Sequence, residues 1–424
     1  MRAPEWLFPK SSHCCSHRWV WTWPSSLFRS ALYLRHFEES RRIGSSIDSG
    51  STGPSLLDET QDRHPGPLRS NGVPKGYAAV NLLPSYPCAV SIVVVSFNTR
   101  ELLRECLLSV LAECARLPGG GTAEIATAEI LVVDNASTDG SADMVDREFS
   151  ASATPVRVIR GEVNRGFGVA NNLAIEAAQG QYLVLLNSDA FFHPGALRLA
   201  LEHMRANPAV GIGGGRLVGR DGAPQPSARC FPSIWMDALV LTGLSNRFPH
   251  SRIFGAPDRT WADPNQPADV DWIPGAFLIL RREALIETGL FDPAFFLYYE
   301  EVDLCRRVKS AGFRVVYWPD IVVTHLGGES SSRLSSFKLS SHAREVVLWR
   351  MRSTLLYYRK HHGWQARLAM GLEIILYAMR RLRNFRNSNP ARRERGHEAA
   401  LLQRLMLQAW RETRGGRISP PAPW

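Results

Sequence analysis

The sequence predicts an α/β fold in which a mostly parallel central sheet is flanked by helices. Between residues 89 and 325, apolar runs of strand length alternate with segments whose apolar residues recur every three or four positions. The first run, 90–95, is rich in β-branched residues, as expected of a strand buried on both faces. Strands separated by helices pair in parallel, and their carboxyl ends border the functional crevice of an open sheet.

Four strands and two helices are predicted in the first half of this region. Thr99 is suited to cap the first helix, because apolar residues recur at helical spacing from 102 to 114. The second helix is predicted over 169–178. The strands are predicted at 90–95, 130–133, 156–159 and 182–186. Farther along, the apolar run 277–280 precedes a helix that begins near Glu300, and 315–324 is a further strand.

By composition the chain divides into three parts. Residues 1–85 show no sustained period and are predicted to be a mostly disordered extension. Residues 86–330 form the predicted α/β domain, and residues 331–424 a basic, amphipathic helical region with a tail. The seven cysteines are odd in number and scattered, unlike a disulfide framework, which favours a reducing cytoplasm.

Positive charge is concentrated at the carboxyl end. Residues 344–424 hold seventeen Arg or Lys and five Glu, in a chain of formal net charge +10. The apolar run 368–379 is too short to span a bilayer, and its arginine flanks suit in-plane attachment to the anionic cytoplasmic face of a membrane. The alternative is a set of helices packed on the α/β domain with a solvated basic face. Nucleic-acid binding is not expected, since no recognised module accompanies the charge.

Polar residues follow every predicted strand of the first half. A turn would explain any one of them, but the carboxyl ends of parallel strands meet at one edge, so the four groups together indicate a binding site. These residues are Ser96 and Asn98 after the first strand, Asp134 after the second, Asn164 and Gly166 after the third, and Asn187, Ser188 and Asp189 after the fourth.

Asp134 and Asp189 are suited to share the binding of a nucleotide. One carboxylate would accept hydrogen bonds from the base or ribose, and the other would ligate a hard divalent cation, Mg²⁺ or Mn²⁺, beneath the phosphates. No complete dinucleotide fingerprint competes, because 166–168 lacks the third glycine and 213–215 precedes no helical pattern. A dehydrogenase is therefore not expected.

Three acidic residues lie within four positions at the start of the helix near residue 300. Asp303 and Arg307 are four apart and can pair on one helical face. Glu300 and Glu301 then remain at the helix start, where a carboxylate either offsets the helix dipole or serves as a general base. His325 follows the last predicted strand and is placed either to complete a metal shell or contact a diphosphate, or to serve structure alone.

In order and together, these motifs resemble glycosyltransferase family 2 and, within it, the rhamnosyltransferase-like bacterial enzymes. The resemblance covers roughly residues 89–328. The motifs are Val-Ser-Phe-Asn at 95–98, Val-Asp-Asn-Ala-Ser-Thr-Asp-Gly-Ser at 133–141, Asn-Arg-Gly-Phe-Gly-Val-Ala-Asn-Asn at 164–172, Leu-Leu-Asn-Ser-Asp at 185–189, Pro-Gly-Ala-Phe at 274–277, Tyr-Glu-Glu-Val-Asp-Leu-Cys at 299–305 and His-Leu-Gly-Gly at 325–328.

This resemblance implies the GT-A type of nucleotide-diphospho-sugar transferase fold and a role for several residues. Asp134 would contact the nucleotide, Asp189 would be the metal-binding acid of a degenerate DXD motif, and Glu301 would be the base. The chain departs from the family pattern in two places. Asn187 stands for the first acid of the DXD motif, and Glu300-Glu301 for the usual Glu-Asp pair. The Gln-x-x-Arg-Trp signature of processive synthases is absent, which implies addition of a single sugar.

The sequence therefore predicts an inverting, non-processive glycosyltransferase of cell-envelope polysaccharide synthesis, peripheral on the cytoplasmic face of the membrane. The resemblance implies dTDP-rhamnose as donor and a glycan or lipid-linked acceptor. One alternative is a sugar-phosphate nucleotidylyltransferase, which should carry a Gly-rich, Arg- or Lys-bearing loop where Ser96-Phe97-Asn98 stands. The other is a catalytically degenerate nucleotide-sugar-binding membrane scaffold, which the departures at Asn187 and Glu301 would suit.

Overall fold

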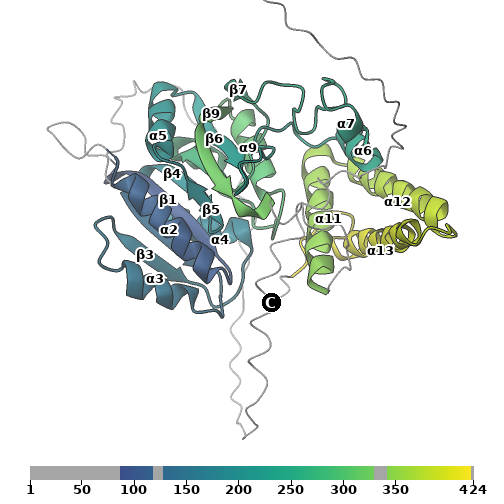
Figure 1. Ribbon diagram of the computed structural model, residues 1–424, viewed down its shortest axis with the longest axis horizontal. Coiled ribbons are helices and arrows are strands. Elements are labelled where there is room, and N and C mark those ends of the chain that lie inside the picture. Colours follow the sequence, from purple (N-terminus) through teal and green to yellow (C-terminus); the bar gives the residue numbers. More distant parts are fainter. Residues whose placement is uncertain (1–85, 118–127, 329–340, 422–424) are drawn as a thin grey trace, which may run out of the picture.

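The computed structural model describes residues 86–117, 128–328 and 341–421. The disorder predicted for residues 1–85 therefore concerns a segment outside the described residues, as do the first ten residues of the predicted region 331–424. The described chain forms an α/β domain and a group of carboxyl-terminal helices that lies to one side of it (Figure 1).

In the described part of the chain, nine strands form one mixed sheet, in the order β3-β2-β1-β4-β8-β6-β9-β5, with β7 paired to β9. The first four strands in this order run parallel, and each contains one of the four predicted strands, so the predicted α/β class is confirmed. Their bounds are β1 (Cys88–Ser96), β2 (Ala128–Asp134), β3 (Val156–Arg160) and β4 (Gly180–Asn187).

Beyond β4 the sheet has both strand directions. β8 (Phe277–Arg281) is antiparallel to β4 and to β6 (Val210–Val218), whereas β9 (Arg314–His325) runs parallel to β6. The short strands β5 (Ala190–Phe192) and β7 (Ala268–Asp269) pair antiparallel with β9. Because β8 is antiparallel, its amino end lies beside the carboxyl end of β4, at the functional edge of the sheet.

Helices cover both faces of the sheet, because successive residues of the central strands point to opposite sides. Ile92 of β1 faces a core that includes side chains of α2, α3 and α5, and Val93 faces a second core with α4, α8 and α9. The bounds are α2 (Arg100–Cys114), α3 (Ser141–Phe149), α4 (Phe167–Ala177), α5 (Ala196–Ala206), α8 (Arg282–Thr288) and α9 (Glu300–Ser310).

Strand β6 was not predicted, because three successive glycines stand at its centre and glycine is depleted in strands. A Cβ on Gly213 would lie 2.0 Å from the Trp318 ring, and one on Gly214 would lie 2.3 Å from the Ile273 side chain. The glycines therefore allow large neighbouring side chains to rest directly on the backbone.

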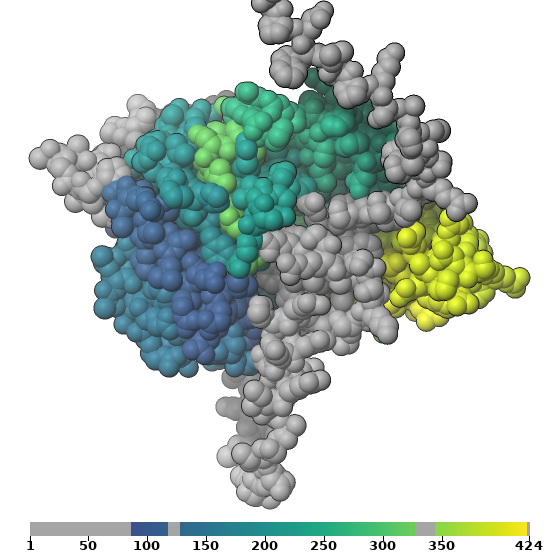
Figure 2. All heavy atoms as spheres, viewed as in Figure 1, coloured from purple at the N-terminus to yellow at the C-terminus, as the bar shows by residue number. Residues whose placement is uncertain are grey.

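The carboxyl-terminal group consists of α11 (Ser341–His362), α12 (Gln365–Asn384) and α13 (Pro390–Glu412), together with α6 (Ile234–Thr242) and α7 (Leu244–Arg247). In the space-filling view its carboxyl-terminal part, drawn in yellow, projects to one side (Figure 2). α11, α12 and α13 all lie within the region 331–424 that was predicted to be helical, and α12 contains the apolar run 368–379. Tyr357 of α11 shares a core with Val302 of α9, so this group packs on the α/β domain.

Asp303 connects α9 to α11. Its carboxylate is fully buried and lies 2.8 Å from Arg307 Nε, 2.7 Å from Lys360 Nζ and 2.6 Å from His361 Nε2. The predicted Asp303–Arg307 pair is therefore confirmed. Burial alone would raise the pKa of Asp303, but hydrogen bonds from His361 and Lys360, with the charge of Arg307, outweigh burial and lower the pKa to about 2.

We expect Asp303→Ala to lower the free energy of unfolding by about 1.5–3 kcal/mol, because the change removes a buried carboxylate that accepts charge-assisted hydrogen bonds from Arg307 and His361. Urea unfolding of the full chain measures this loss. Asp143→Ala, which removes an exposed surface pair with Arg160, should cost less than ~1 kcal/mol. Since folding lowers the pKa of Asp303, its contribution is complete above the ordinary Asp pKa and is lost as the pH falls toward about 2. Equal stability of the two variants would contradict this interpretation.

Candidate active site

Three strand ends meet at one edge of the sheet. The pairing register places Ser96 of β1 beside Asp134 of β2, and Val95 beside Asn187 of β4. The backbone N–H of Asn187 also donates to the carbonyl oxygen of Ala276, the residue before β8, over 3.1 Å. The predicted convergence of polar residues at the carboxyl ends of the parallel strands is thus present.

Several of the predicted polar residues hold the loops of this edge together. The Thr99 hydroxyl lies 3.0 Å from Ser96 Oγ and donates to Ser188 Oγ over 2.9 Å, so it connects β1 to the end of β4 instead of capping α2. Asn98 has a φ of 54°, and its Oδ1 accepts a hydrogen bond from the backbone N–H of Thr138. These contacts fix the loop after β1 against its neighbours.

The loop after β3 packs against the segment that leads into α9. Asn164 Oδ1 accepts hydrogen bonds from Asn135 Nδ2 and from the backbone N–H of Gly166. Gly166 has a φ of 83°, and a Cβ there would lie 2.1 Å from the carbonyl oxygen of Phe296. Only glycine satisfies both requirements, so the Asn-Arg-Gly motif sets a close backbone contact.

Asp134 presents an unpaired carboxylate oxygen at this edge. The side chain is buried, and Oδ1 has no hydrogen-bond partner among the described residues. Burial raises the pKa of Asp134, although hydrogen bonds from Ser137 act in the opposite direction. A buried acceptor without a partner is costly, and a donor group on a ligand would remove that cost.

Asn187, Asp189 and His325 form a second polar corner, because β9 pairs with β5 and brings its last residue beside Ala190. His325 Nε2 lies 3.5 Å from Asp189 Oδ1 and 3.5 Å from Asn187 Nδ2. A Cβ on Gly327, in the 3-10 turn η3 (Leu326–Gly328), would meet the His325 ring at 2.9 Å. The Gly-Gly that follows His325 therefore permits this close approach.

Gln225, which was not predicted, orients the His325 ring. Its Nε2 donates to the backbone carbonyl of His325 over 2.8 Å, and its Oε1 lies 3.0 Å from His325 Nδ1. An amide oxygen accepts only, so Nδ1 carries a proton, and in the neutral ring the lone pair is on Nε2, toward Asp189. Gln225 lies in a loop with no periodic pattern, so the sequence contains no signal for this contact.

The corner fits a hard divalent cation. The buried oxygens Asn187 Oδ1 and Asp189 Oδ1 have no hydrogen-bond partner in the described chain, and the His325 lone pair faces the same space. Within 86–117, 128–328 and 341–421, no group of three or more His, Cys, Asp or Glu side chains is arranged to hold a metal ion. Mg²⁺ is commonly held by one or two carboxylates together with the phosphates of a substrate, which matches this sparse set.

Glu300 and Glu301 begin α9; Glu300 is buried and Glu301 is half-buried. Each has one carboxylate oxygen, Oε2, that has no hydrogen-bond partner among the described residues. Burial raises the pKa of both, and the neighbouring charge of Glu301 raises that of Glu300 further. Backbone N–H groups, including that of Gly275, partly offset the effect at Glu301. Glu301 is thereby connected to the same segment, 275–276, that pairs with Asn187.

The turn before Glu300 is held by α11. Tyr298 and Tyr299 have φ values of 68° and 70°, a conformation that costs on the order of 1–3 kcal/mol for a residue other than glycine. Ser353 Oγ donates to the carbonyl oxygen of Leu297 over 2.8 Å, and the Tyr299 ring packs 5.2 Å from that of Tyr357. The carboxyl-terminal helices therefore help to fix the acidic start of α9.

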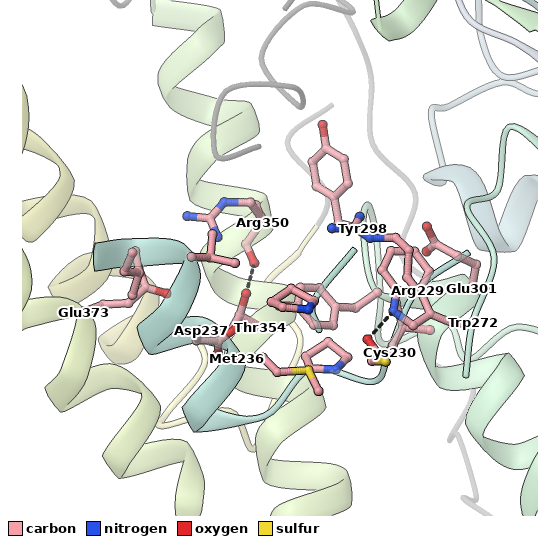
Figure 3. A pocket seen from close by; sticks show the side chains of 16 residues that line it. Arg229, Cys230, Met236, Asp237, Trp272, Tyr298, Glu301, Arg350, Thr354 and Glu373 are labelled. Carbon is pink, nitrogen blue, oxygen red and sulfur yellow. Dashed lines mark hydrogen bonds between the residues drawn. The ribbon is translucent and has the colours of Figure 1, made fainter. Parts of the chain in front are cut away.

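A cavity of about 190 Å³ opens beside Glu301, between the α/β domain and helices α6, α11 and α12 (Figure 3). Arg229 and Trp272 lie near Glu301, and Asp237, Arg350 and Glu373 lie across the cavity from them. Of these, Glu301 belongs to a motif singled out in the sequence, and Trp272 stands two residues before another, 274–277. The others come from the aperiodic loop before α6, from α6 itself and from the basic helices, which the sequence places far from the predicted site.

The chain is similar to glycosyltransferases along most of the α/β domain. A model of glycosyl transferase family 2 matches residues 91–249, and a model described as glycosyltransferase like family 2 matches residues 265–347. Together the two matches cover more than half of the chain. It belongs to glycosyltransferase family 2 and is an enzyme of that family, as predicted.

Characterised relatives place it near rhamnosyltransferases, which confirms the predicted subgroup. N-acetylglucosaminyl-diphospho-decaprenol L-rhamnosyltransferase of Mycobacterium tuberculosis is 27% identical over 268 residues, 61% of this chain and 85% of the relative. Rhamnosyltransferase WbbL of Escherichia coli is 24% identical over 204 residues, 45% of this chain and 69% of the relative. The solved mannosyltransferase PcManGT from Pyrobaculum calidifontis, in complex with GDP-Man and Mn²⁺, is 17% identical with a TM-score of 0.46, covering 92% of this chain and 96% of its own.

The half-buried Asp237 should make stability depend on pH. Burial raises its pKa to about 7, helped by the charge of Glu373 and opposed by the hydrogen bond from Tyr358. The folded chain then keeps a proton that the unfolded chain releases near the ordinary Asp pKa. We therefore expect the free energy of unfolding to fall by on the order of 1 kcal/mol per pH unit as pH rises toward 7, relative to Asp237→Asn. Urea unfolding at a series of pH values measures this change. The same dependence of the free energy of unfolding on pH in the wild type and in Asp237→Asn would exclude the effect.

Proposed function

We propose that this enzyme transfers one sugar, with inversion, from a nucleotide donor to a glycan or lipid-linked acceptor in cell-envelope polysaccharide synthesis. The observation that carries the proposal is a pair of carboxylates, on either side of one segment, that each keep one buried oxygen without a hydrogen-bond partner among the described residues. Asp189 lies at the end of β4, whose Asn187 pairs with Ala276, and Glu301 accepts from Gly275. Asp189 can then hold the cation that binds the departing diphosphate, and Glu301 can accept the proton of the attacking hydroxyl.

The donor would lie along the carboxyl edge of the parallel strands. The unpaired oxygen of Asp134 would accept a hydrogen bond from the nucleoside, with Ser96, Asn98, Asn164, Gly166 and Ser188 shaping the surrounding loops. Asn187, Asp189 and His325 would hold Mg²⁺ or Mn²⁺. Such a cation, when bound, neutralises the charge that develops on the departing diphosphate.

Glu301 would act as the general base. Its unpaired oxygen accepts the proton of the acceptor hydroxyl while the oxygen of that hydroxyl forms a bond to the anomeric carbon. The bond between the anomeric carbon and the diphosphate breaks with its electron pair on the diphosphate oxygen, so the configuration inverts. Glu300 is buried more deeply, and its Cβ lies 3.4 Å from the position of a Cβ on Gly168, so it faces α4. We assign Glu300 to electrostatic support of Glu301.

The names of two relatives support rhamnose as the transferred sugar and a lipid-linked sugar as the acceptor, and we propose dTDP-rhamnose as the donor. The Mycobacterium tuberculosis relative is named for rhamnosyl transfer to N-acetylglucosaminyl-diphospho-decaprenol, and the Escherichia coli relative is a rhamnosyltransferase. A sugar-phosphate nucleotidylyltransferase is not favoured, because the family matches are to glycosyltransferases. The degenerate membrane scaffold predicts donor binding without turnover, so the assay below separates it from the enzyme.

We further propose that α12 attaches the enzyme to the anionic cytoplasmic face of a membrane. Six apolar residues spaced along one side of the helix and just beyond its ends are 46–79% exposed: Trp364, Leu368, Ile375, Met379, Leu382 and Phe385. Exposed arginines flank them, among them Arg367, Arg381, Arg383 and Arg386. An apolar stripe bordered by cations suits an interface of acyl chains and acidic headgroups. No described helix is long and apolar enough to cross a membrane.

Glu301→Gln should reduce transfer by ~10²–10⁴-fold, because the amide cannot accept the hydroxyl proton. The assay supplies dTDP-rhamnose and other nucleotide sugars, Mg²⁺ or Mn²⁺, and membrane extract as the source of acceptor, and detects released nucleoside diphosphate. Since folding raises the pKa of Glu301, wild-type kcat/KM should rise with pH through an inflection above the ordinary Glu pKa.

The control is Glu287→Gln, an exposed acid on α8 that should leave the rate unchanged. Full activity of Glu301→Gln would remove Glu301 as the base. Nucleotide-sugar binding by the wild type with no release from any donor would favour the scaffold over the transferase.

Leu368→Ser combined with Ile375→Ser should lower binding to phosphatidylglycerol vesicles ~10-fold or more, because two apolar side chains no longer enter the interface. Cosedimentation with these vesicles and with neutral phosphatidylcholine vesicles measures the change. Ile286→Ser removes an even more exposed isoleucine from α8, away from the stripe, and should bind as wild type does. Equal binding of the wild type to phosphatidylglycerol and phosphatidylcholine vesicles would contradict attachment through α12. Equal binding of the wild type and the double variant to phosphatidylglycerol vesicles would contradict it as well.

A further inference from the structure

The cavity beside Glu301 has polar groups at both ends and apolar walls between them. Glu301 and Arg229 lie at one end, and Asp237, Arg350 and Glu373 lie at the other (Figure 3). Its remaining lining includes Met236, Val240, Leu241, Trp272, Tyr299 and Val302. A small site of this kind, apolar and aromatic with a few placed polar groups, is typical of a specific small-ligand pocket.

The charges in the cavity are already compensated by protein groups. Arg229 forms an ion pair with Asp258 and stacks over the Trp272 ring with its guanidinium carbon 4.6 Å from the ring centroid. Burial by itself would lower the pKa of Arg350, but nearby Glu373 and Asp237 help to raise it, so the guanidinium stays charged between two acids. Two arginines thus face at least as many carboxylates. Such a balance disfavours a phosphate, which needs uncompensated cations.

The two acids at the far end, of which Glu373 is buried and Asp237 is half-buried, keep the capacity to accept further hydrogen bonds. Tyr358 donates to Asp237 Oδ2 over 2.6 Å, and Tyr377 donates to Glu373 Oε2 over 2.8 Å. A carboxylate can accept several hydrogen bonds, so one donor each does not saturate either group. Hydroxyl groups of an uncharged ligand would add to these contacts without bringing a second charge into the cavity.

We propose that this cavity is the acceptor subsite and that it takes the terminal sugar ring of the acceptor, with Asp237 and Glu373 as determinants of which ring is accepted. The inference rests on the proposed function, because it is Glu301 at the near end that would activate the sugar hydroxyl. The carbon-bound hydrogens of a sugar ring suit the rings of Trp272 and Tyr299, and its hydroxyls suit the acids.

The far end of this subsite belongs to the part of the chain beyond the family matches. These matches end at residue 347, whereas Arg350, Thr354 and Glu373 come later, from α11 and α12. The helices that carry the exposed apolar stripe therefore also close the cavity. A membrane-bound acceptor would meet the attachment surface and the subsite on one structural unit.

The test measures binding of octyl glycosides of glucose, galactose and N-acetylglucosamine to the full chain by calorimetry, with Mg²⁺ and dTDP present. At least one glycoside should bind the wild type, and Glu373→Gln should weaken that binding ~10-fold, because an amide replaces a hydrogen-bonding carboxylate. Val240→Phe, which narrows the cavity without touching a charge, should weaken it at least as much.

The matched control is Glu283→Gln, which alters another carboxyl that accepts from a tyrosine, Tyr86, at a distance of 3.0 Å and away from the cavity. It should bind the glycosides as the wild type does. No binding of any glycoside to the wild type, or equal binding by wild type, Glu373→Gln and Val240→Phe, would overturn the subsite. Binding of dTDP reports on the proposed function separately, since its absence in the wild type would count against the donor site and not against the cavity.

Discussion

The position of the acidic start of α9 depends on one buried interaction, the contact of Asp303 with α11. A fully buried carboxylate between Arg307, Lys360 and His361 can exist only if both helices keep their relative position, because separation would leave charged groups unpaired in a dry interior. Two features at the start of α9 depend on this contact. The left-handed Tyr298 and Tyr299 are held in place, and Glu301 is fixed toward the cavity.

The turn 296–299 lies between the two halves of the proposed reaction. On one side, Gly166 approaches the carbonyl oxygen of Phe296 too closely for any side chain, which ties the turn to the loop after β3. On the other side, the Phe296 ring packs 4.5 Å from that of Trp349 on α11. The loop after β3, at the proposed donor site, and helix α11, beside the proposed acceptor site, thus both contact the segment 296–299. A movement of α11 would displace the proposed base relative to the proposed donor site, so the proposed mechanism depends on the carboxyl-terminal helices.

Much of the site could be predicted from the sequence because its signals are local. A buried parallel strand is an apolar run, and the polar residues at its end follow it directly in the chain, so Asp134, Asn187 and Asp189 were identifiable. The pairing of Asp303 with Arg307 followed from helical spacing alone. By contrast, Gln225 and Arg350 act through partners 100 residues or more away or on another helix, and their sequence surroundings have no period that would single them out.

The sequence by itself determined the α/β class, the four parallel strands and the polar edge, because periodicity and strand ends are properties of neighbouring residues. Only the tertiary structure decided how β6 forms, since its glycines are explained by the side chains of Trp318 and Ile273 that lie upon them. It also decided that the basic helices close a cavity beside Glu301 while presenting an apolar stripe outward. Both facts depend on which faces of distant helices meet, and burial of charged and aromatic groups fixes that choice.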